Sequence, residues 1–494
     1  MISSDLESNR VEELDELLDL IKPKILDFVQ KSDPNSSNYE ADSLGRYNSP
    51  SFLKDQFADE LKLEGIKGDT EKLNEFLDKV LKYSVNTWNP GFLDKLYASN
   101  NPIGVISDII LSVLNTNSHV FTVSPVLSVL ENFVGKKYAK LFFKNDTCGG
   151  LTFSGGSWSN ITSLQIARSL KFPKTKEFGN EGYKFAVYTS VHCHYSVVKA
   201  AQLLGLGSAN VFKVEVNKNG TMKYEELPKI IEKSIEEGFT PLYINATAGT
   251  TVYGSYDNFT EISKIAKKFD IWFHIDGSWG GNVIFSSKHS VKLEGSELSD
   301  SITVNPHKML GVPTTCSFLL IPNVKDFQRA MSLSAPYLFH GREIDEFENF
   351  DLADGTMGCG RRADSFKFYL AWYYYGSKGF EERVDHAFNI VEYFIDKITK
   401  IDGFQLVNES KCLQVCFFYK PKDYKGDFTT ITRYISRELH KDGKYLVDFS
   451  PNTDGDNQEF FRVVFNSPIL TDKIIDDLIT SIIVTGEQYA KSLD

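Results

Sequence analysis

Short apolar runs alternate with amphipathic segments between about residue 101 and residue 380, and this alternation limits the folds open to the chain. The runs expected to form strands are FAVYTS (185–190), PLYINA (241–246), IWFHID (271–276), SITV (301–304) and SFLLI (317–321). Between them, segments such as YEELPKIIEKSIEEG and FTEISKIAKKF carry apolar residues at helical spacing. Strands that alternate with helices predict an α/β fold, with a mostly parallel sheet flanked by helices.

The two ends of the chain follow different patterns and predict separate parts. Residues 1–100 are mostly helical in pattern, as in VEELDELLDLIKPKILDFVQ. Residues 381–494 combine the amphipathic segments ERVDHAFNIVEYFIDKITKI and TTITRYISREL with the apolar runs CLQVCFFY and FFRVVFN. We therefore expect a helical N-terminal segment (1–100), a large α/β domain (101–380) and a small α+β domain (381–494).

Charge and cysteine content exclude several classes of protein. A net charge of −12 and a pI near 5.4 argue against a nucleic-acid surface, which needs clustered lysine and arginine. The six cysteines form no zinc-like CxxC pairs and are expected to be free thiols in a reducing compartment. The acidic start MISSDLESNRVEELDELL is unlike a signal peptide, and no apolar run reaches the roughly 18 residues of a membrane span. We expect a cytoplasmic protein that binds neither membrane nor nucleic acid.

Polar, chemically capable residues follow the predicted strands at the points where they end. These segments are TFSGGSWSN (152–160), VHCHYS (191–196), NATAGTT (245–251), DGSWGG (276–281) and NPHK (305–308). Because the carboxyl ends of parallel strands meet at one edge of a sheet, where ligands bind, we expect one assembled site.

Taken one at a time, these segments have ordinary interpretations. A Gly-Gly-Ser before a helix is often only a tight turn, although bare glycine backbone at a helix start also suits a phosphate. His192 and His194 could bind a metal, but no carboxylate or cysteine set accompanies them, so no metal site is expected. Asp276 could cap a helix, and Lys308 could pair with a phosphate or carboxylate.

Together they favour pyridoxal phosphate as a cofactor. Lys308, after an apolar strand, would supply the amine that condenses with the cofactor's aldehyde. Asp276 would keep the pyridine nitrogen protonated, and a histidine would cover one face of the ring. Backbone amides of the glycine-rich segment would hold the phosphate.

The segments VNPHKMLGVP, FHIDGSWGG, NATAGTTVYG, TSVHCHYS and FSGGSWSN resemble the group II pyridoxal-phosphate amino-acid decarboxylases. Within that family the chain resembles the branch of glutamate, cysteine-sulfinate and aspartate decarboxylases, from about residue 85 to about residue 420. The resemblance implies a fold-type I, aminotransferase-like architecture. It also implies a homodimer with active sites at the subunit interface.

The resemblance carries roles to individual residues of this chain. Lys308 would bond covalently to the cofactor, Asp276 would pair with the pyridinium nitrogen, and His194 would stack on the ring. The remaining assignments are phosphate contacts from the backbone of Ser157 and Trp158, further cofactor contacts from Thr247, Asn305 and His307, and substrate contacts from Arg361 and Lys95. Arg361, in CGRRAD, matches the arginine that binds the substrate's distal acid group, for which a bidentate guanidinium is suited.

Three departures from the family pattern bear on the chemistry. Gly277 and Ser278 follow Asp276 where relatives carry Ala-Ala or Ala-Trp, and Lys95 replaces the family's pocket glutamine. The loop from Leu338 to Phe368 contains no tyrosine, although relatives place their catalytic tyrosine there. His340, or more weakly His192, is the candidate substitute as proton donor to Cα.

These features predict α-decarboxylation of a small acidic amino acid. Lys95 adds a second cation, Trp158 adds bulk, and Ser157 is the residue of the aspartate and cysteine-sulfinate branches, so a short pocket is expected. Aspartate, giving β-alanine, therefore ranks before cysteine sulfinate and glutamate. The missing tyrosine keeps open an aldehyde-forming oxidative decarboxylase or an aminotransferase. A catalytically dead scaffold that only dimerises is the alternative from another class.

Overall fold

The computed structural model describes residues 9–62, 70–335, 337–339, 350–453, 455 and 457–493. The chain divides into two compact units, one of residues 1–99, 390–407 and 416–494, the other of residues 100–389 and 408–415. This grouping differs from the predicted three parts, because the N-terminal segment and the C-terminal region belong to one unit. The short strand β1 (Phe92–Leu93) explains the difference, since it pairs in parallel with β11 (Leu446–Pro451).

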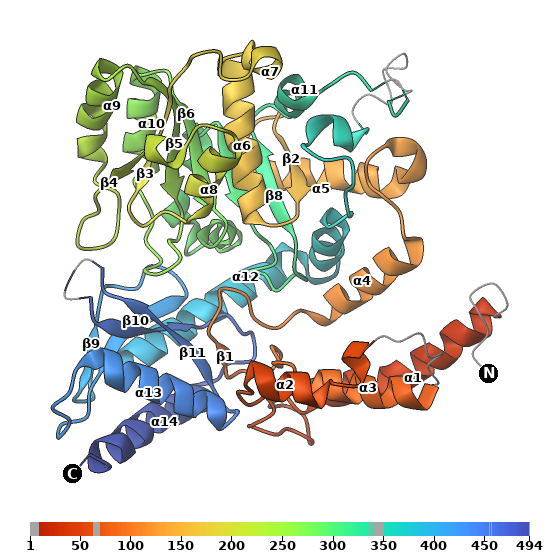
Figure 1. Cartoon of the computed structure of the whole chain (residues 1–494), viewed down its shortest axis with the longest axis vertical. Coiled ribbons are helices and arrows are strands. Elements are labelled where there is room, and N and C mark those ends of the chain that lie inside the picture. Colours follow the sequence, from red (N-terminus) through yellow and green to blue (C-terminus); the bar gives the residue numbers. More distant parts are fainter. Residues whose placement is uncertain are drawn as a thin grey trace. The chain divides into compact units, whose positions relative to one another are not determined.

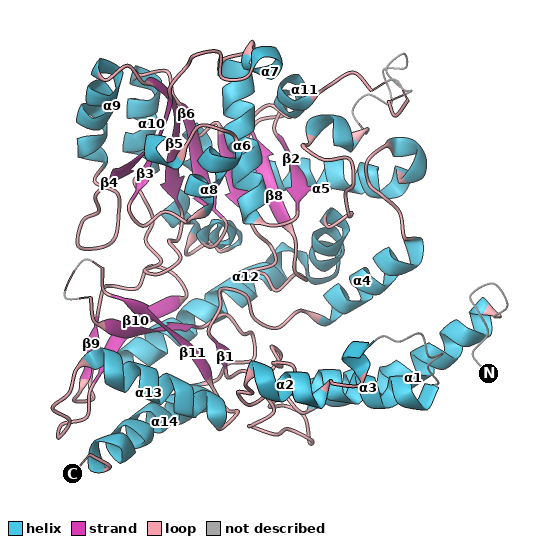
Figure 2. Ribbon diagram, in the orientation of Figure 1, coloured by secondary structure: helices cyan, strands magenta, loops and turns pink. Residues whose placement is uncertain are grey.

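The larger unit is built on a seven-stranded sheet in the order β2-β8-β7-β6-β5-β3-β4 (Figure 2). Its strands are β2 (Gly149–Phe153), β3 (Phe185–Ser190), β4 (Val211–Val214), β5 (Thr240–Thr247), β6 (Trp272–Gly277), β7 (Ser301–Val304) and β8 (Ser317–Ile321). Neighbouring strands from β4 to β7 are parallel, whereas β8 runs antiparallel to both β7 and β2. The predicted α/β fold with a mostly parallel sheet is confirmed, and each of the predicted strands coincides with one of these to within a residue or two at its ends.

Helices cover both faces of this sheet (Figure 1). The helices of this unit are α4 (Pro102–Leu114), α5 (Pro125–Phe143), α6 (Gly156–Lys171), α7 (Thr175–Phe178), α8 (Ser196–Leu203), α9 (Leu227–Glu236), α10 (Phe259–Lys268), α11 (Lys325–Met331) and α12 (Ser365–Ile398), the last continuing into the other unit. Ser159 of α6 hydrogen-bonds Ser317 of β8 at 2.7 Å, and the Tyr138 ring of α5 lies 5.5 Å from that of Phe318. Because neighbouring strand residues face opposite sides, α6 and α5 pack on opposite faces.

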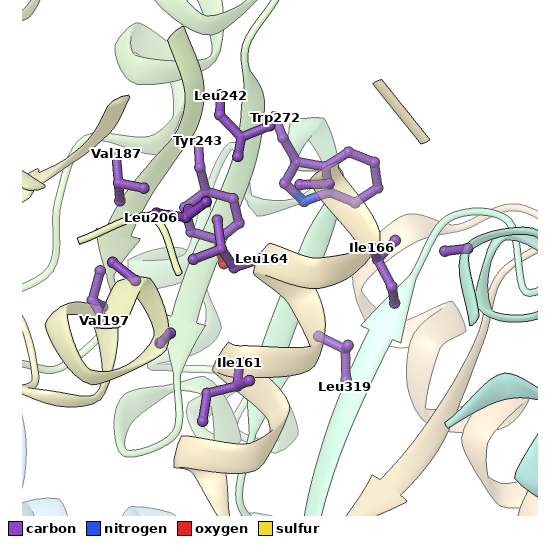
Figure 3. Packing of buried hydrophobic residues seen from close by; sticks show 14 of the residues in the cluster. Ile161, Leu164, Ile166, Val187, Val197, Leu206, Leu242, Tyr243, Trp272 and Leu319 are labelled. Atoms are coloured by element: carbon purple, nitrogen blue, oxygen red, sulfur yellow. The ribbon is translucent and has the colours of Figure 1, made fainter. Parts of the chain in front are cut away.

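A cluster of buried hydrophobic residues lies between α6 and the sheet. Figure 3 shows Ile161 and Leu164 of the helix near Tyr243 and Leu319 of the strands, all of them buried. A parallel sheet covered on both faces needs strands that are apolar throughout, and β3, β7 and β8 are buried along their whole length. This packing holds α6 rigidly against the strand ends.

The smaller unit contains a five-stranded sheet in the order β1-β11-β12-β10-β9. Its other strands are β9 (Phe404–Leu406), β10 (Gln414–Tyr419, whose first residues belong to the larger unit) and β12 (Glu459–Val464). Its helices are α1 (Arg10–Gln30), α2 (Pro50–Gln56), α3 (Thr70–Tyr83), α13 (Phe428–Lys441) and α14 (Asp472–Lys491). Across the described part of the chain, none of the helices has the length and apolar character needed to cross a membrane.

Candidate active site

A cavity of about 240 Å³ opens at the carboxyl edge of the seven-stranded sheet, within the larger unit. Its lining residues are Gly156, Ser157, His194, Tyr195, Thr247, Gly249, Thr251, Asp276, Ser278, Trp279, Asn305, His307 and Lys308. They come from the start of α6 and from the segments at and after the ends of β3, β5, β6 and β7. The structure therefore brings together the strand-end residues that the sequence analysis selected.

The direction of β8 explains why the glycine-rich segment after β2 lies at the carboxyl edge of the parallel strands. β2 and β7 are both antiparallel to β8, so they point the same way and end at the same edge. Gly155, which follows β2, has φ +113°, a conformation that favours glycine. The next residue, Gly156, begins α6 and delivers the amides of its first turn to the cavity.

Gly156 also leaves room that any side chain would fill. A Cβ atom there would lie 2.5 Å from Ser278 Oγ and 2.9 Å from Asn305 Nδ2. The first amides of α6 lack intrahelical partners and lie at the positive end of the helix dipole, which suits a phosphate. This cradle supports the prediction for Ser157.

Trp158 is not part of the described cavity lining, and its predicted contact with the phosphate stays a prediction. Its backbone N–H donates to the Gly155 carbonyl at 3.0 Å, and its side chain is half exposed and does not line the cavity. Trp158 lines a separate pocket that also contains Met357 and Arg361. The expectation that its bulk shortens the substrate pocket therefore has no support in the structure.

Asp276, the next-to-last residue of β6, is a buried carboxylate with donors on both oxygens. Oδ1 accepts from the Ser278 N–H at 3.0 Å, and Oδ2 accepts from Asn160 Nδ2 at 2.9 Å. Burial raises the pKa of Asp276, but His194, Ser278, His274 and Lys308 together bring it below its ordinary value. A charged carboxylate in this position can hold a proton on an aromatic nitrogen in the cavity.

The two histidines of VHCHYS behave differently. His194 lines the cavity, and its Nδ1 lies 2.8 Å from Ser196 Oγ, while burial lowers its pKa. A neutral, flat ring in this place suits stacking on a planar ligand. His192 instead lies with its ring 4.7 Å from the Tyr253 ring and is not part of the described lining. The role of His192 as a proton donor stays a prediction, and His340 lies outside the described residues.

Lys308 follows β7 by four residues and lines the cavity as a half-buried side chain. Near it, His307 Nδ1 lies 2.6 Å from the Cys316 carbonyl oxygen, and burial lowers the pKa of His307 to about 4. The backbone N–H of Lys308 donates to the Asn305 carbonyl at 3.1 Å, which tightens the turn.

Two polar atoms of the cavity lining lack a hydrogen-bond partner within the described part of the protein. Thr247 Oγ1 and Asn305 Oδ1 are buried and have no hydrogen-bond partner among the described residues. Buried polar groups are almost always satisfied, so a bound molecule is expected to supply the partners. With the amine of Lys308, the carboxylate of Asp276 and the cradle at Gly156, this donor set fits pyridoxal phosphate.

Arg361 lies outside this cavity and is engaged in the protein interior. Its guanidinium donates to Glu131, to the Ser118 carbonyl at 2.7 Å and to the Thr152 carbonyl at 3.2 Å. Its side chain is only 6% exposed. In this structure the guanidinium of Arg361 is occupied by these partners, and its binding of the substrate's acid group stays a prediction.

Lys95 belongs to the other unit and pairs with carboxylates there. Its Nζ lies 3.1 Å from Asp94 and 3.3 Å from Asp448. Arg462 of β12, a buried arginine that the sequence analysis did not select, also donates to Asp448 and to the Asp94 carbonyl. A charged residue inside the apolar run FFRVVFN was the signal that could have identified it.

Two further residues, which lie behind the cavity lining, were missed by the sequence analysis. Asn160 of α6 contacts Asp276 directly, and His274 of β6 contacts Asn160 with Nε2 at 3.1 Å from Oδ1. Asn160 follows Gly156 by one helical turn, and His274 precedes Asp276 by two strand residues. Both spacings place the residues on the same face as the selected ones, which is the signal that was available.

Comparison with known proteins agrees with this arrangement. The pyridoxal-dependent decarboxylase conserved domain matches residues 51–420, and with them every lining residue of the cavity. The chain belongs to this family. It is 44% identical to the L-aspartate decarboxylase dtxS4 of Metarhizium robertsii, over 94% of this chain and 95% of that protein. It is 33% identical to cysteine sulfinic acid decarboxylase of Rattus norvegicus, over 89% and 90%.

A solved structure shows the same architecture. The crystal structure of mouse CSAD superposes with a TM-score of 0.89 and 30% identity, and the alignment covers 96% of this chain and 99% of that one. The fold-type I architecture is thereby confirmed. This decarboxylase uses pyridoxal phosphate, and it acts on an amino acid.

Proposed function

We propose that this decarboxylase removes the α-carboxylate of L-aspartate and releases β-alanine and carbon dioxide. The observation that carries the proposal is the 44% identity, along nearly the whole chain, to an L-aspartate decarboxylase. Other relatives are cysteine sulfinic acid decarboxylases and an acidic amino acid decarboxylase, at 32–34% identity. Glutamate and cysteine sulfinate are accordingly the alternative substrates.

The cavity residues account for the main requirements of the reaction. When bound, pyridoxal phosphate supplies an aldehyde that takes up the substrate amine and a protonated ring that accepts the electron pair left as carbon dioxide departs. Asp276 holds the ring-nitrogen proton, and His194 covers a face of the ring. Lys308 would provide the amine that holds the cofactor. The positive end of α6 holds the phosphate at Gly156 and Ser157, and Thr247 and Asn305 complete their hydrogen bonds on the ligand.

Protonation of Cα completes the product, and its donor is proposed from the sequence alone. The described lining includes Tyr195 and no other tyrosine, and the loop after Leu338 carries none. His340 stays the proposed donor. An enzyme that lacked a donor would let molecular oxygen take the electrons, with aldehyde, ammonia and hydrogen peroxide as the outcome.

A side-by-side assay tests this function. Purified holoenzyme is incubated with aspartate, glutamate or cysteine sulfinate, and amine, carbon dioxide and hydrogen peroxide are measured together. We expect β-alanine from aspartate at the highest kcat/KM, in equal amount to carbon dioxide and without peroxide. A higher kcat/KM with glutamate or cysteine sulfinate would show that aspartate is not the preferred substrate. Hydrogen peroxide in equal amount to carbon dioxide would show that the enzyme forms an aldehyde instead of an amine.

A homodimer is proposed from an apolar surface of the larger unit. Helix α4 buries Gly104, Ser107 and Leu111, yet it exposes apolar side chains on its other faces. The exposed ones are Ile106, Ile109, Ile110, Val113 and Leu114, and α5 adds Val126, Val129 and Phe133. Leu111 of α4 and Leu127 of α5 belong to one hydrophobic cluster, so the two helices are neighbours. Exposed apolar side chains on neighbouring helices are typical of a protein–protein interface, and the resemblance implies a second copy as the partner.

Light scattering tests the dimer. We expect twice the chain mass of 55.9 kDa for the wild type, and monomers for a variant with both Val113→Glu and Phe133→Glu. Val291→Glu, at another exposed valine, is the matched control and should stay dimeric. A monomeric wild type would refute the proposal. A cytoplasmic location is also proposed, because all six cysteines are free, as in a reducing compartment.

A further inference from the structure

One face of α6 and one face of β6 meet beside the cavity. Gly156 and Asn160 lie four residues apart and therefore share a helix face. Trp272, His274 and Asp276 alternate along β6 and share the sheet face toward this helix. The result is a buried row of polar groups that runs from Asp276 away from the cavity, and no step of the proposed reaction uses it.

The orientation of the Asn160 amide follows from its neighbour. A carboxylate can only accept hydrogen bonds, so the atom of Asn160 that lies 2.9 Å from Asp276 Oδ2 must be the Nδ2 donor. The same nitrogen donates to Ser196 Oγ at 3.0 Å. The amide oxygen consequently points the other way, toward His274.

The tautomer of His274 follows in turn. Its Nε2 lies 3.1 Å from Asn160 Oδ1, and an amide oxygen only accepts, so Nε2 carries the hydrogen. Burial lowers the pKa of His274 to about 4, so the ring is neutral near pH 7. Its Nδ1 is then an acceptor for the hydroxyls of Ser301, at 2.8 Å, and Ser163, at 3.0 Å.

Donors also form the outer end of the row. The Trp272 indole N–H donates to Ser301 Oγ at 2.9 Å, and the Tyr243 hydroxyl donates to Ser163 Oγ at 2.9 Å. The Tyr243 ring stacks on His274 with centroids 5.5 Å apart. An indole nitrogen can only donate, so successive hydrogen bonds point inward from Trp272 to Asp276.

We propose that Asn160 and His274 are positioning residues that keep the ring nitrogen of the cofactor protonated by acting through Asp276. The inference rests on the proposed role of Asp276 and goes one step beyond it. A carboxylate that receives donors stays charged, and a charged Asp276 holds the proton of the ring. Without the N–H of His274, the amide oxygen of Asn160 loses this donor, and the amide is held less firmly with its Nδ2 toward the carboxylate.

The test measures the ring nitrogen itself rather than turnover. Apoprotein is reconstituted with pyridoxal phosphate labelled with ¹⁵N in the ring, and the ¹⁵N chemical shift at neutral pH reports protonation. The dissociation constant of the cofactor is measured on the same proteins by fluorescence. The variants are His274→Leu, His274→Gln and Asn160→Leu. Leucine fills the space without donating, whereas the amide of glutamine can donate to Asn160 Oδ1.

We expect His274→Leu and Asn160→Leu to move the ¹⁵N shift toward the unprotonated value. A hydrogen bond to a charged group corresponds to roughly tenfold to a hundredfold in binding, so the cofactor's dissociation constant should rise by about that factor. His274→Gln should restore both readouts to near wild type. Tyr188→Phe removes a comparably buried hydrogen bond, to Ser234 at 2.6 Å, and should change neither readout.

The variant Asp276→Asn distinguishes the positioning role of Asn160 and His274 from the proposed role of Asp276. If Asp276→Asn leaves the ring nitrogen protonated, the proposed role of Asp276 is wrong. If Asp276→Asn shifts the nitrogen but His274→Leu and Asn160→Leu do not, only the positioning role is refuted. Circular dichroism of each apoprotein shows whether it folds, and should His274→Leu fail to fold, Asn160→Leu decides the question by the same two readouts.

Discussion

Arg361 and Glu131 form an ion pair inside the larger unit, with their side chains 6% and 0% exposed. Glu131 Oε1 also accepts from the N–H and hydroxyl of Thr152, both at 2.9 Å, and Oε2 accepts from Ser365 at 3.1 Å. The pair joins α5 to β2 and to the segment before α12. To bind Arg361, the acid group of a substrate would have to displace the carboxylate of Glu131, which also accepts hydrogen bonds from Thr152 and Ser365.

Glu131→Gln and Arg361→Met should therefore destabilise the protein. Removing one member of a buried ion pair leaves an uncompensated charge, which costs about 3–5 kcal/mol of unfolding free energy. Chemical denaturation of the apoprotein measures the loss, and the KM for aspartate of the folded fraction should change little. A large rise in KM at unchanged stability would instead return Arg361 to substrate binding.

Lys308→Ala should abolish turnover and the visible absorbance band that arises from the cofactor's Schiff base with this lysine. The described lining of the cavity includes no second lysine, so no other amine can make the covalent bond. Lys308→Arg is the matched variant, because it retains a cation near Asp276 but has no free amine to react. Both variants are expected to be inactive, and near-normal activity in either one would refute the assignment of Lys308.

Gly156→Ala should weaken cofactor binding, with little effect on the fold. The added Cβ would lie 2.5 Å from Ser278 Oγ, so the start of α6 or Ser278 must move within the phosphate cradle. We expect the dissociation constant of pyridoxal phosphate to rise at least about tenfold, since a misplaced helix start loses charge-assisted hydrogen bonds. Gly358→Ala, where a Cβ meets nothing within 4 Å, is the control and should bind normally.

Stability should fall in acid partly because of His307. Burial lowers its pKa to about 4, below the ordinary value near 6.5, so between these values the unfolded chain binds more protons than the folded one. The stabilisation is complete above about pH 6.5 and is lost as the pH falls toward 4, up to roughly 3 kcal/mol. Urea denaturation of wild type and His307→Asn across this range checks the sign. The variant should show a shallower dependence, and an equal slope would refute the prediction.

Lys95→Gln tests the remaining proposal on selectivity. If Lys95 binds the distal acid group, its loss should lower kcat/KM for aspartate by about tenfold to a hundredfold, and less for glutamate. If it only pairs with Asp94 and Asp448, no substrate should be affected, because an ion pair with a half-exposed lysine contributes little. Lys95→Arg keeps the charge and serves as the control.

Much of the sheet and the cavity could be predicted because both follow local rules. Buried parallel strands are apolar along their length, which marked 185–190 and 301–304 directly. Because the carboxyl ends of parallel strands meet at one edge, the glycines at the start of α6 could be predicted to lie near Asp276, Asn305 and Lys308, and the cavity lining includes Gly156 with all three. The antiparallel course of β8 was not predicted, since an apolar run has the same composition in either direction.

The sequence by itself determined the alternation of strands and helices, the family, and the residues at the carboxyl edge, because spacing along an element decides which face a side chain takes. Only the tertiary structure decided the partners of the charged groups. Arg361 and Trp158 stand beside plausible motifs in the sequence, yet one is paired with Glu131 and the other is half exposed. Asn160 and His274 gain their significance the same way, since the polar atoms that meet a buried carboxylate depend on packing between elements far apart in the chain.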